Sequence, residues 1–163
     1  MIIWIKKNLE TVKYNKILKN KLKLGLRDYK EYSEIYSNIE IEIIICQQSY
    51  GKFINIQGNE KLFYHIYFNN DKNEIKNKYS INIRDKVEKI KIIIDHQIDS
   101  FKNLFELCEC IDSINFKKIY RKNINDMSYM FNKCSYLKKK LFFRILIIVM
   151  LKIWAVCLMN AFH

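Results

Sequence analysis

Two stretches of the sequence repeat one spacing of apolar residues at an interval of 26 residues, "LFELCECIDSINF" and "MFNKCSYLKKKLF". In each, an apolar residue and phenylalanine are followed three residues later by cysteine and, after three more, by an aliphatic residue. In order, these are Leu104, Phe105, Cys108 and Ile111 in the first stretch and Met130, Phe131, Cys134 and Leu137 in the second. A fixed interval of this length is typical of repeat architectures, in which each unit buries its apolar face against its neighbours. This repeat constrains the fold more than any other feature of the chain.

The residue types at these positions suit a shared interior. Phenylalanine and the aliphatic residues would point inward, and cysteine is a small filler for a crowded core. Asparagine and aspartate between them are typical of corners, because their side chains hydrogen-bond the backbone where the chain bends. About three stacked repeats are expected to be needed for stability, whereas only two can be recognised in this sequence.

The second stretch and the residues before it, "INDMSYMFNKCSYL", resemble the BspA-like leucine-rich repeat family, whose pattern is roughly V-x-D-M-S-x-M-F-x-x-C-x-x-L. The matching positions are Ile124, Asp126, Met127, Ser128, Met130, Phe131, Cys134 and Leu137. The first stretch is similar to a degenerate repeat, with Leu104 in place of methionine and with Ile111, Ile114 and Phe116 matching the strand that follows. The resemblance covers residues 98–139 closely and 36–97 loosely. It implies a solenoid with short parallel strands, no catalysis, and a role in adhesion or protein contact at the cell surface.

The rest of the chain divides by pattern. Residues 1–35 predict an amphipathic helix and a polar linker, and no cleavage site of a signal peptide follows Met1 to Ile5. Residues 36–97 predict a β-rich unit, because "IEIEIII" and "VEKIKIIID" alternate and contain β-branched residues. Residues 98–140 hold the repeats. The predicted fold class is therefore α+β, with an N-terminal helix, a small β-rich unit, leucine-rich-repeat-like solenoid coils and a hydrophobic C-terminal helix.

Residues 141–163 differ from the rest of the chain, since they contain no acidic residue and both alanines. One interpretation is a membrane span from Leu141 to Ala161, although Arg144 and Lys152 interrupt it. The preferred interpretation is a further repeat read in a shifted frame, because back-translation with A/T-rich codons regenerates the repeat pattern 26 positions after Asp126. A buried terminal helix is the third alternative.

The net charge of +12 raises the question of nucleic acid. The lysines are scattered and only four arginines are present, so a nucleic-acid partner is disfavoured, whereas an acidic membrane surface is equally compatible with the charge. No metal or cofactor is expected, because the odd cysteine count and the C-x-C pair Cys108 and Cys110 fit no zinc pattern. No phosphate-binding or hydrolase motif is present, and the adjacent Asp95 and His96 are expected at a corner of the fold.

These observations predict a non-enzymatic repeat protein that binds a protein partner, which the sequence does not identify, or that acts in adhesion. A small protein with one membrane span is the alternative, and a basic nucleic-acid-binding protein is the third. The sequence leaves the compartment open between the cell surface and a membrane.

Overall fold

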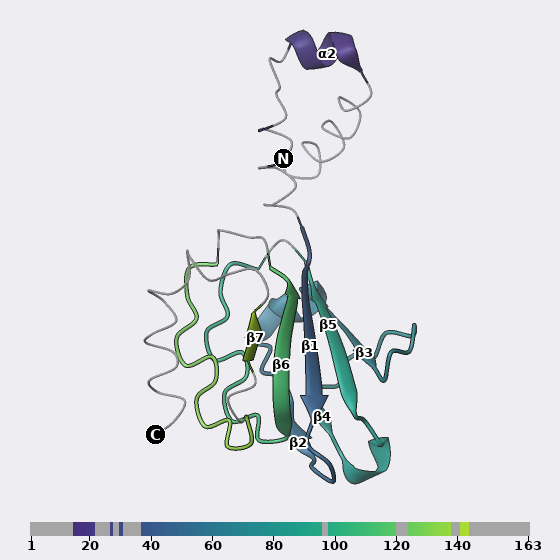
Figure 1. Cartoon of the computed structure of the whole chain (residues 1–163), viewed down its shortest axis with the longest axis vertical. Helices are drawn as coiled ribbons and strands as arrows, with labels where there is room; N and C mark the ends of the chain where they lie inside the picture. The colour runs from purple at the N-terminus through teal and green to yellow at the C-terminus, as the bar shows by residue number, and fades with distance from the viewer. Residues whose placement is uncertain are drawn as a thin grey trace.

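The computed structural model describes residues 15–21, 27, 30, 37–95, 98–119, 124–137 and 141–143. Its main element is a five-stranded sheet in the order β3-β5-β1-β6-β7 (Figure 1). The strands are β3 (Tyr64–Phe68), β5 (Lys89–Ile94), β1 (Ile39–Ile45), β6 (Ile111–Lys118) and β7 (Leu141–Phe143). Neighbouring strands are antiparallel except β6 and β7, which are parallel. The remaining elements are α2 (Lys16–Lys21), β2 (Gly51–Lys52), β4 (Ser80–Ile81), and the 3-10 helices η1 (Gly58–Phe63) and η2 (Ile83–Asp85).

The alternating sequence of β1 explains its central place in the sheet. Its isoleucines at 39, 41, 43 and 45 are buried, while Glu40 and Glu42 point to the other face. β5 alternates in the same way, so that Ile90, Ile92 and Ile94 lie on the inner face with the isoleucines of β1. The strands at 39–45 and within 87–95 therefore form where their patterns predict.

The outer face of the sheet is held by ion pairs between strands. Glu42 contacts Lys89 of β5 and, at 2.8 Å, Lys117 of β6. Glu40 lies 3.5 Å from Lys91 and 3.6 Å from Lys118. Each carboxylate thus stands between lysines of both flanking strands, which is the favourable cross-strand arrangement of opposite charges.

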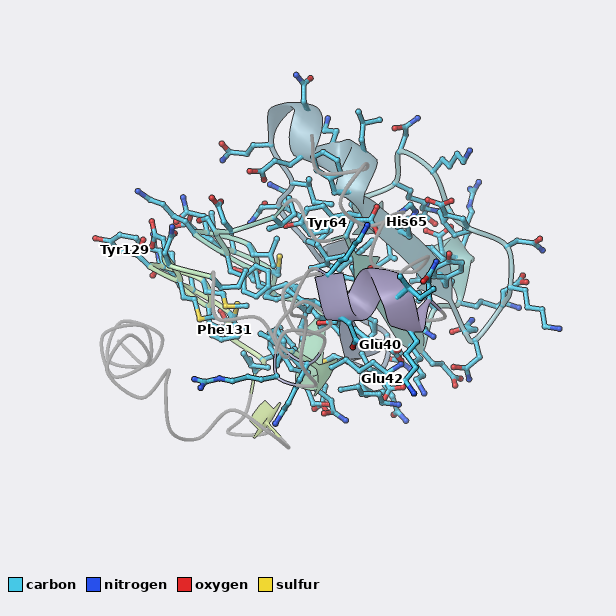
Figure 2. The ribbon with its side chains drawn as sticks, turned by 90° about the horizontal axis from the view of Figure 1, so that it is seen from above. Glu40, Glu42, Tyr64, His65, Tyr129 and Phe131 are labelled. Carbon is cyan, nitrogen blue, oxygen red and sulfur yellow. The ribbon has the colours of Figure 1, made fainter. Side chains whose placement is uncertain are left out.

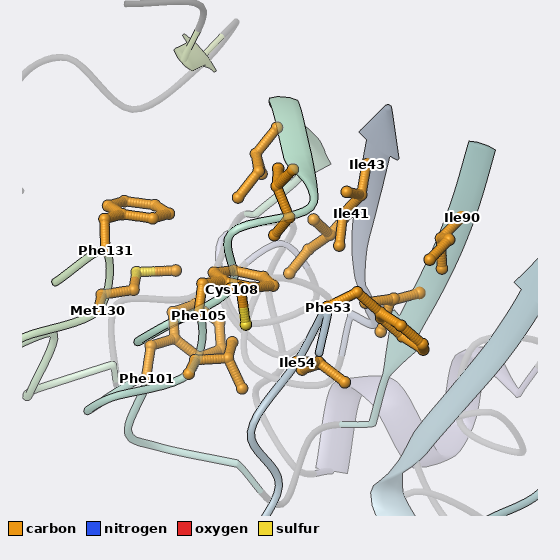
Figure 3. Close-up of a cluster of buried hydrophobic side chains, with 14 of the residues drawn as sticks. Ile41, Ile43, Phe53, Ile54, Ile90, Phe101, Phe105, Cys108, Met130 and Phe131 are labelled. Carbon is orange, nitrogen blue, oxygen red and sulfur yellow. The ribbon is translucent and has the colours of Figure 1, made fainter. Parts of the chain in front are cut away.

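The inner face packs on the turn-rich part of the chain. A single cluster of buried apolar side chains extends from the sheet isoleucines through Phe53 to Phe105 and Phe131 (Figure 3). The Phe101 and Phe116 rings, with centroids 6.3 Å apart, join the first repeat to β6. The core is therefore shared between the sheet and the two repeats.

The predicted fold class is wrong for the described residues. Their regular secondary structure is mostly strand, and they contain no helix of seven or more residues. Of the segment with the predicted N-terminal helix they show the six-residue α2, with Arg27 and Lys30 also helical, and most of its other residues lie outside the described part of the chain. The predicted solenoid coils are replaced by turns at 102–107 and 128–133, and β6 joins the antiparallel sheet beside β1 instead of a coil.

The predicted C-terminal helix is also contradicted at its first residues, because 141–143 form β7. Residues 144–163, and with them most of the predicted span and the frame-shifted repeat, lie outside the described residues. Within the described part of the chain, no helix has the length and apolar character needed to cross a bilayer. β7 pairs Leu141 with Ile114, an offset of 27 residues, so the 26-residue alignment of Phe116 with Phe142 does not hold there.

Candidate functional site

The two repeats lie side by side and run in the same direction at the left of the sheet in Figure 1. We call residues 98–110 and 124–137 the repeat segments. Ser100 pairs with Asp126, and the backbone of one segment bonds the backbone of the other at successive alternate residues. The donor and acceptor pairs are Phe101 N to Asp126 O, 2.7 Å; Asn103 N to Ser128 O, 3.0 Å; Phe105 N to Met130 O, 2.9 Å; Leu107 N to Asn132 O, 2.9 Å; and Asn125 N to Asp99 O, 2.9 Å. The segments are thus in register at the 26-residue interval of the sequence.

The backbone conformation is also the same in both segments. Asn103 and Tyr129 have φ angles of 57° and 55°, and Leu107 and Lys133 both have 57°. Left-handed residues are uncommon outside glycine and asparagine, so their recurrence at equivalent positions identifies one local conformation built twice. These residues end the extended conformation after a few residues, which is why the segments contain turns and no long strand.

The apolar residues predicted from the repeat are all buried. They are Leu104, Phe105, Cys108, Ile111, Ile114, Phe116, Met127, Met130, Phe131, Cys134 and Leu137. The rings of Phe105 and Phe131 stack with centroids 5.8 Å apart and planes inclined by 3°. Ile111, Ile114 and Phe116 lie on the inner face of β6, and not in the repeat segments themselves.

The polar member of the predicted set, Asp126, is half-buried at a corner. Its Oδ1 accepts a hydrogen bond from the Ser128 backbone N–H at 2.8 Å. Hydrogen bonds from the Ser128 backbone and side chain hold the pKa of Asp126 below its usual value. Asp126 is therefore a turn-stabilising carboxylate, bonded within its own segment.

The cysteines of the repeat segments are free thiols in the core. Burial raises the pKa of Cys110 to about 11 and that of Cys134 to about 12, and it raises the pKa of Cys108 further still. The Cys134 thiol donates to the Phe105 carbonyl at 2.9 Å. Since the thiolate is the reactive form, these residues act as core fillers. No group of three potential ligands placed to hold a metal ion occurs among the described residues.

We call the exposed side chains of the repeat segments their outward face, and three of them are large apolar or aromatic residues that were not predicted from the sequence. Leu107, Tyr129 and Tyr136 are about half exposed, at 51%, 48% and 50%. Figure 2 shows Tyr129 at the outer margin of the molecule, with Phe131 on the inner side of the same segment. Leu107 and Tyr129 have left-handed φ angles of 57° and 55°, a conformation that leucine and tyrosine do not predict, so the sequence offered no signal for these two positions.

The first repeat segment is bounded on its other side by residues 53–57. The Asn55 backbone N–H donates to the Leu104 carbonyl at 2.7 Å, and its side-chain amide donates to Asn103 O at 3.0 Å and Glu106 O at 2.5 Å. Asn55 thereby satisfies carbonyls at the edge of the segment. A surface groove of about 340 Å³ lies at this junction, with Asn103, Glu106 and Leu107 on one side and Lys52 and residues 54–57 on the other.

Charge is distributed unevenly along the chain. Residues 1–36 carry nine basic and four acidic side chains, and residues 138–163 carry five basic and none acidic. Residues 37–137 carry fifteen basic and thirteen acidic side chains, so they contribute little of the net charge of +12. The basic residues are therefore not scattered evenly, as predicted above, and a count by region of the sequence shows this division.

One histidine of the described residues has acidic partners. His65 of β3 lies between Glu74, 3.0 Å from Nδ1, and Asp95, 3.5 Å from Nε2. Asp95 thus contacts a histidine distant in sequence, while its neighbour His96 lies outside the described residues.

Comparison with known proteins finds no matching family model, no matching curated protein and no matching solved structure.

Proposed function

We propose that the protein is a non-enzymatic binding module that contacts a protein partner through the outward face of the repeat segments. The observation that carries this proposal is the exposure of Leu107, Tyr129 and Tyr136 on a backbone held by segment-to-segment hydrogen bonds. Tyrosine is enriched in the centres of protein interfaces, because it combines a large contact area with few rotatable bonds. A rigid support lowers the entropy lost on binding.

Polar groups on the same segments suit the rim of such an interface. The Asn132 side chain donates to the Glu106 carboxylate at 2.8 Å, so two equivalent positions of the repeat are joined. Lys133 and Lys102 are exposed on either segment. The resemblance to BspA-like repeats supports adhesion or protein contact as the role of this face.

A membrane-associated protein is the second candidate, and the concentration of positive charge in residues 138–163 favours it. Lys138, Lys139 and Lys140 precede a stretch without acidic residues, and basic residues beside an apolar segment are attracted to anionic lipid. Nucleic-acid binding by residues 37–137 has less support, because their basic and acidic side chains nearly balance.

The test compares the full chain with a variant in which Leu107, Tyr129 and Tyr136 are all replaced by serine. Tagged proteins are expressed in the native cell, chemically cross-linked and purified, and the partners are quantified by mass spectrometry. The matched control is Leu62→Ser, because Leu62 is 75% exposed on η1, outside the repeat segments. We expect at least one protein to be retained by the control and depleted at least about tenfold by the triple variant, since interface aromatics contribute about 2 kcal/mol or more each.

Two results would contradict the proposal. One is that no protein distinguishes the triple variant from Leu62→Ser, with both variants folded by circular dichroism. The other is that binding to anionic vesicles accounts for all association and is unaffected by the triple substitution, which would favour the membrane candidate.

A further inference from the structure

The edge of the sheet at β3 is covered by the loop at residues 69–79. Ile75 of this loop forms an antiparallel bridge with Ile66, in which the Ile75 N–H donates to the Ile66 carbonyl at 2.8 Å. Exposed backbone groups of an edge strand are a template for pairing with another chain, so this bridge covers part of that template.

The two ends of the loop are anchored independently of its centre. The Asn69 side chain donates to the Lys86 carbonyl at 3.0 Å and accepts from the Glu88 N–H at 2.9 Å. At the other end, the Tyr79 carbonyl accepts from the Phe53 N–H at 3.1 Å. Both ends would therefore stay attached if the centre of the loop, where Ile75 packs against the core, separated from β3.

The residue that precedes Ile75 ties the centre of the loop to a titratable group. Glu74 lies 3.0 Å from Nδ1 of His65, and Asp95 at the end of β5 lies 3.5 Å from Nε2. All three side chains are about one-third exposed. One imidazole thus joins three elements: β3, the loop and the end of β5.

We propose that His65 is a pH-operated clasp, which holds the 69–79 loop against β3 while the imidazole is protonated and holds it less firmly once the imidazole is neutral. The protonated ring donates to both carboxylates at once. The neutral ring carries one proton, so it donates to only one of them and has no charge to attract the other.

The other charged groups around the ring do not cancel this effect. Lys61 of η1 and Lys76 of the loop line the same surface hollow of about 330 Å³. On the neighbouring strands, Lys91 is paired with Glu40. Partial burial lowers the pKa of His65, but Glu74 and Asp95 raise it by more, so the net pKa lies above the usual 6.5.

The sign of the pH dependence follows from this direction. Because the pKa of His65 is higher in the closed protein than in the opened one, the clasp stabilises the closed loop fully below about pH 6.5. That contribution is lost as the pH rises through the pKa of the folded state.

The Ile75 amide reports directly on the clasp, because its exchange with solvent requires the bridge to Ile66 to open. We would measure its protection by NMR hydrogen exchange in the full chain at about pH 6 and about pH 8.5, corrected for the intrinsic pH dependence of amide exchange. We expect protection to fall about two- to fivefold at the higher pH, the range of a partly exposed ion pair. The Ile92 amide in the centre of the sheet should not follow this change.

Glu74→Gln removes the charge and keeps a hydrogen-bonding side chain, so it should lower the measured pKa of His65 and abolish the pH dependence of Ile75 protection. The matched control is Glu60→Gln, on an exposed η1 residue that forms no ion pair within the described part of the chain. Equal Ile75 protection at both pH values in the unsubstituted protein would overturn the proposal. So would an equal effect of the two glutamine variants on the pKa of His65.

Discussion

The antiparallel sheet and the repeat segments are two solutions to the same problem of fixing the register of extended chain. In the sheet, strands distant in sequence pair, and the two faces differ: Ile41 lies opposite Ile92 on the buried face, whereas Glu42 contacts lysines on the outer face. In the repeat segments, like lies on like: Phe131 stacks on Phe105, and the same left-handed turn recurs at Tyr129 and Asn103.

The difference shows which errors each region excludes. A slip of one residue in β1 would turn its isoleucines to solvent and its glutamates into the core, so alternation alone specifies the register. In the repeat segments, a slip would place Phe131 against Leu104 or Glu106 and would misalign the left-handed turns. In the repeat segments, the register is specified by similar residues at a fixed interval. In the sheet, it is specified by the alternation of apolar and polar residues.

The largest expected effect tests whether the two regions form one cooperative unit. Phe105 is fully buried and stacks on Phe131 within the cluster that also contains the sheet isoleucines. Phe105→Ala should therefore lower the free energy of unfolding by about 3–5 kcal/mol. Urea unfolding should remain a single transition by both tyrosine fluorescence and far-UV circular dichroism.

The matched control is Leu107→Ala, two residues away, where the side chain is half exposed and the expected change is within about 0.5 kcal/mol. Loss of hydrogen-exchange protection in residues 98–110 and 124–137 without any loss in β5 would contradict the prediction. The repeat segments would then unfold separately from the sheet.

The sequence contained more of this structure in some regions than in others. The alternation of Ile39 to Ile45 is enough to predict β1 and its faces, and the interval between Phe105 and Phe131 equals the offset at which the segments pair. The partners of β1 were not predictable, because nothing local specifies that β5 lies on one side of it and β6, whose alternation is interrupted, on the other. The repeat pattern predicted that residues 111–118 form part of a solenoid coil. In the structure they form β6, which pairs with β1 in the sheet.

The groups that join the regions were missed for a related reason. Asn55 and His65 are polar residues in short or aromatic stretches, and their roles depend on contacts across 48 and 30 positions of sequence. The exposed residues Leu107 and Tyr129 were not predicted, because the repeat pattern consists of buried positions. A pattern of burial identifies the core and says nothing about the exposed positions between the buried ones.

The second prediction concerns the junction itself. The Asn55 amide donates to two carbonyls of the first repeat segment, at 3.0 and 2.5 Å. Asn55→Ala leaves these partly buried acceptors without that donor and should reduce the free energy of unfolding by about 1–3 kcal/mol. Chemical denaturation measures the change, and Gln57→Ala, at an exposed position of the same stretch, serves as the control with an expected change within about 0.5 kcal/mol. If both variants lose the same stability, the side chain of Asn55 does not link the two regions.

The smallest expected effect concerns the stability contributed by the charged outer face of the sheet, as distinct from the apolar core beneath it. Burial raises the pKa of Glu42, but Lys117 and Lys89 lower it by more, so the net pKa lies below its usual value. A carboxyl whose pKa is lowered by folding stabilises the native state above the unfolded pKa of about 4.3, and the contribution is lost as the pH falls through the folded pKa. Glu42→Gln should therefore reduce the free energy of unfolding by about 0.5–1 kcal/mol at neutral pH, after allowance for solvent around the two lysines, and by much less at about pH 3.

The pH dependence of this difference in free energy of unfolding shows whether Glu42 stabilises the sheet through its charge or through its packing. Measured by urea unfolding at several pH values, the gap between Glu42→Gln and the unsubstituted protein should close in acid, while Glu60→Gln should show no such gap. A gap that is constant with pH would mean that Glu42 acts through packing on the outer face. The sheet would then resemble the repeat segments, where registration depends on the fit of side chains. If the difference in free energy of unfolding closes in acid, then the strands pair on the outer face through charge. The stabilisation by Glu42 is lost as the pH falls, whereas that by the His65 clasp is lost as the pH rises.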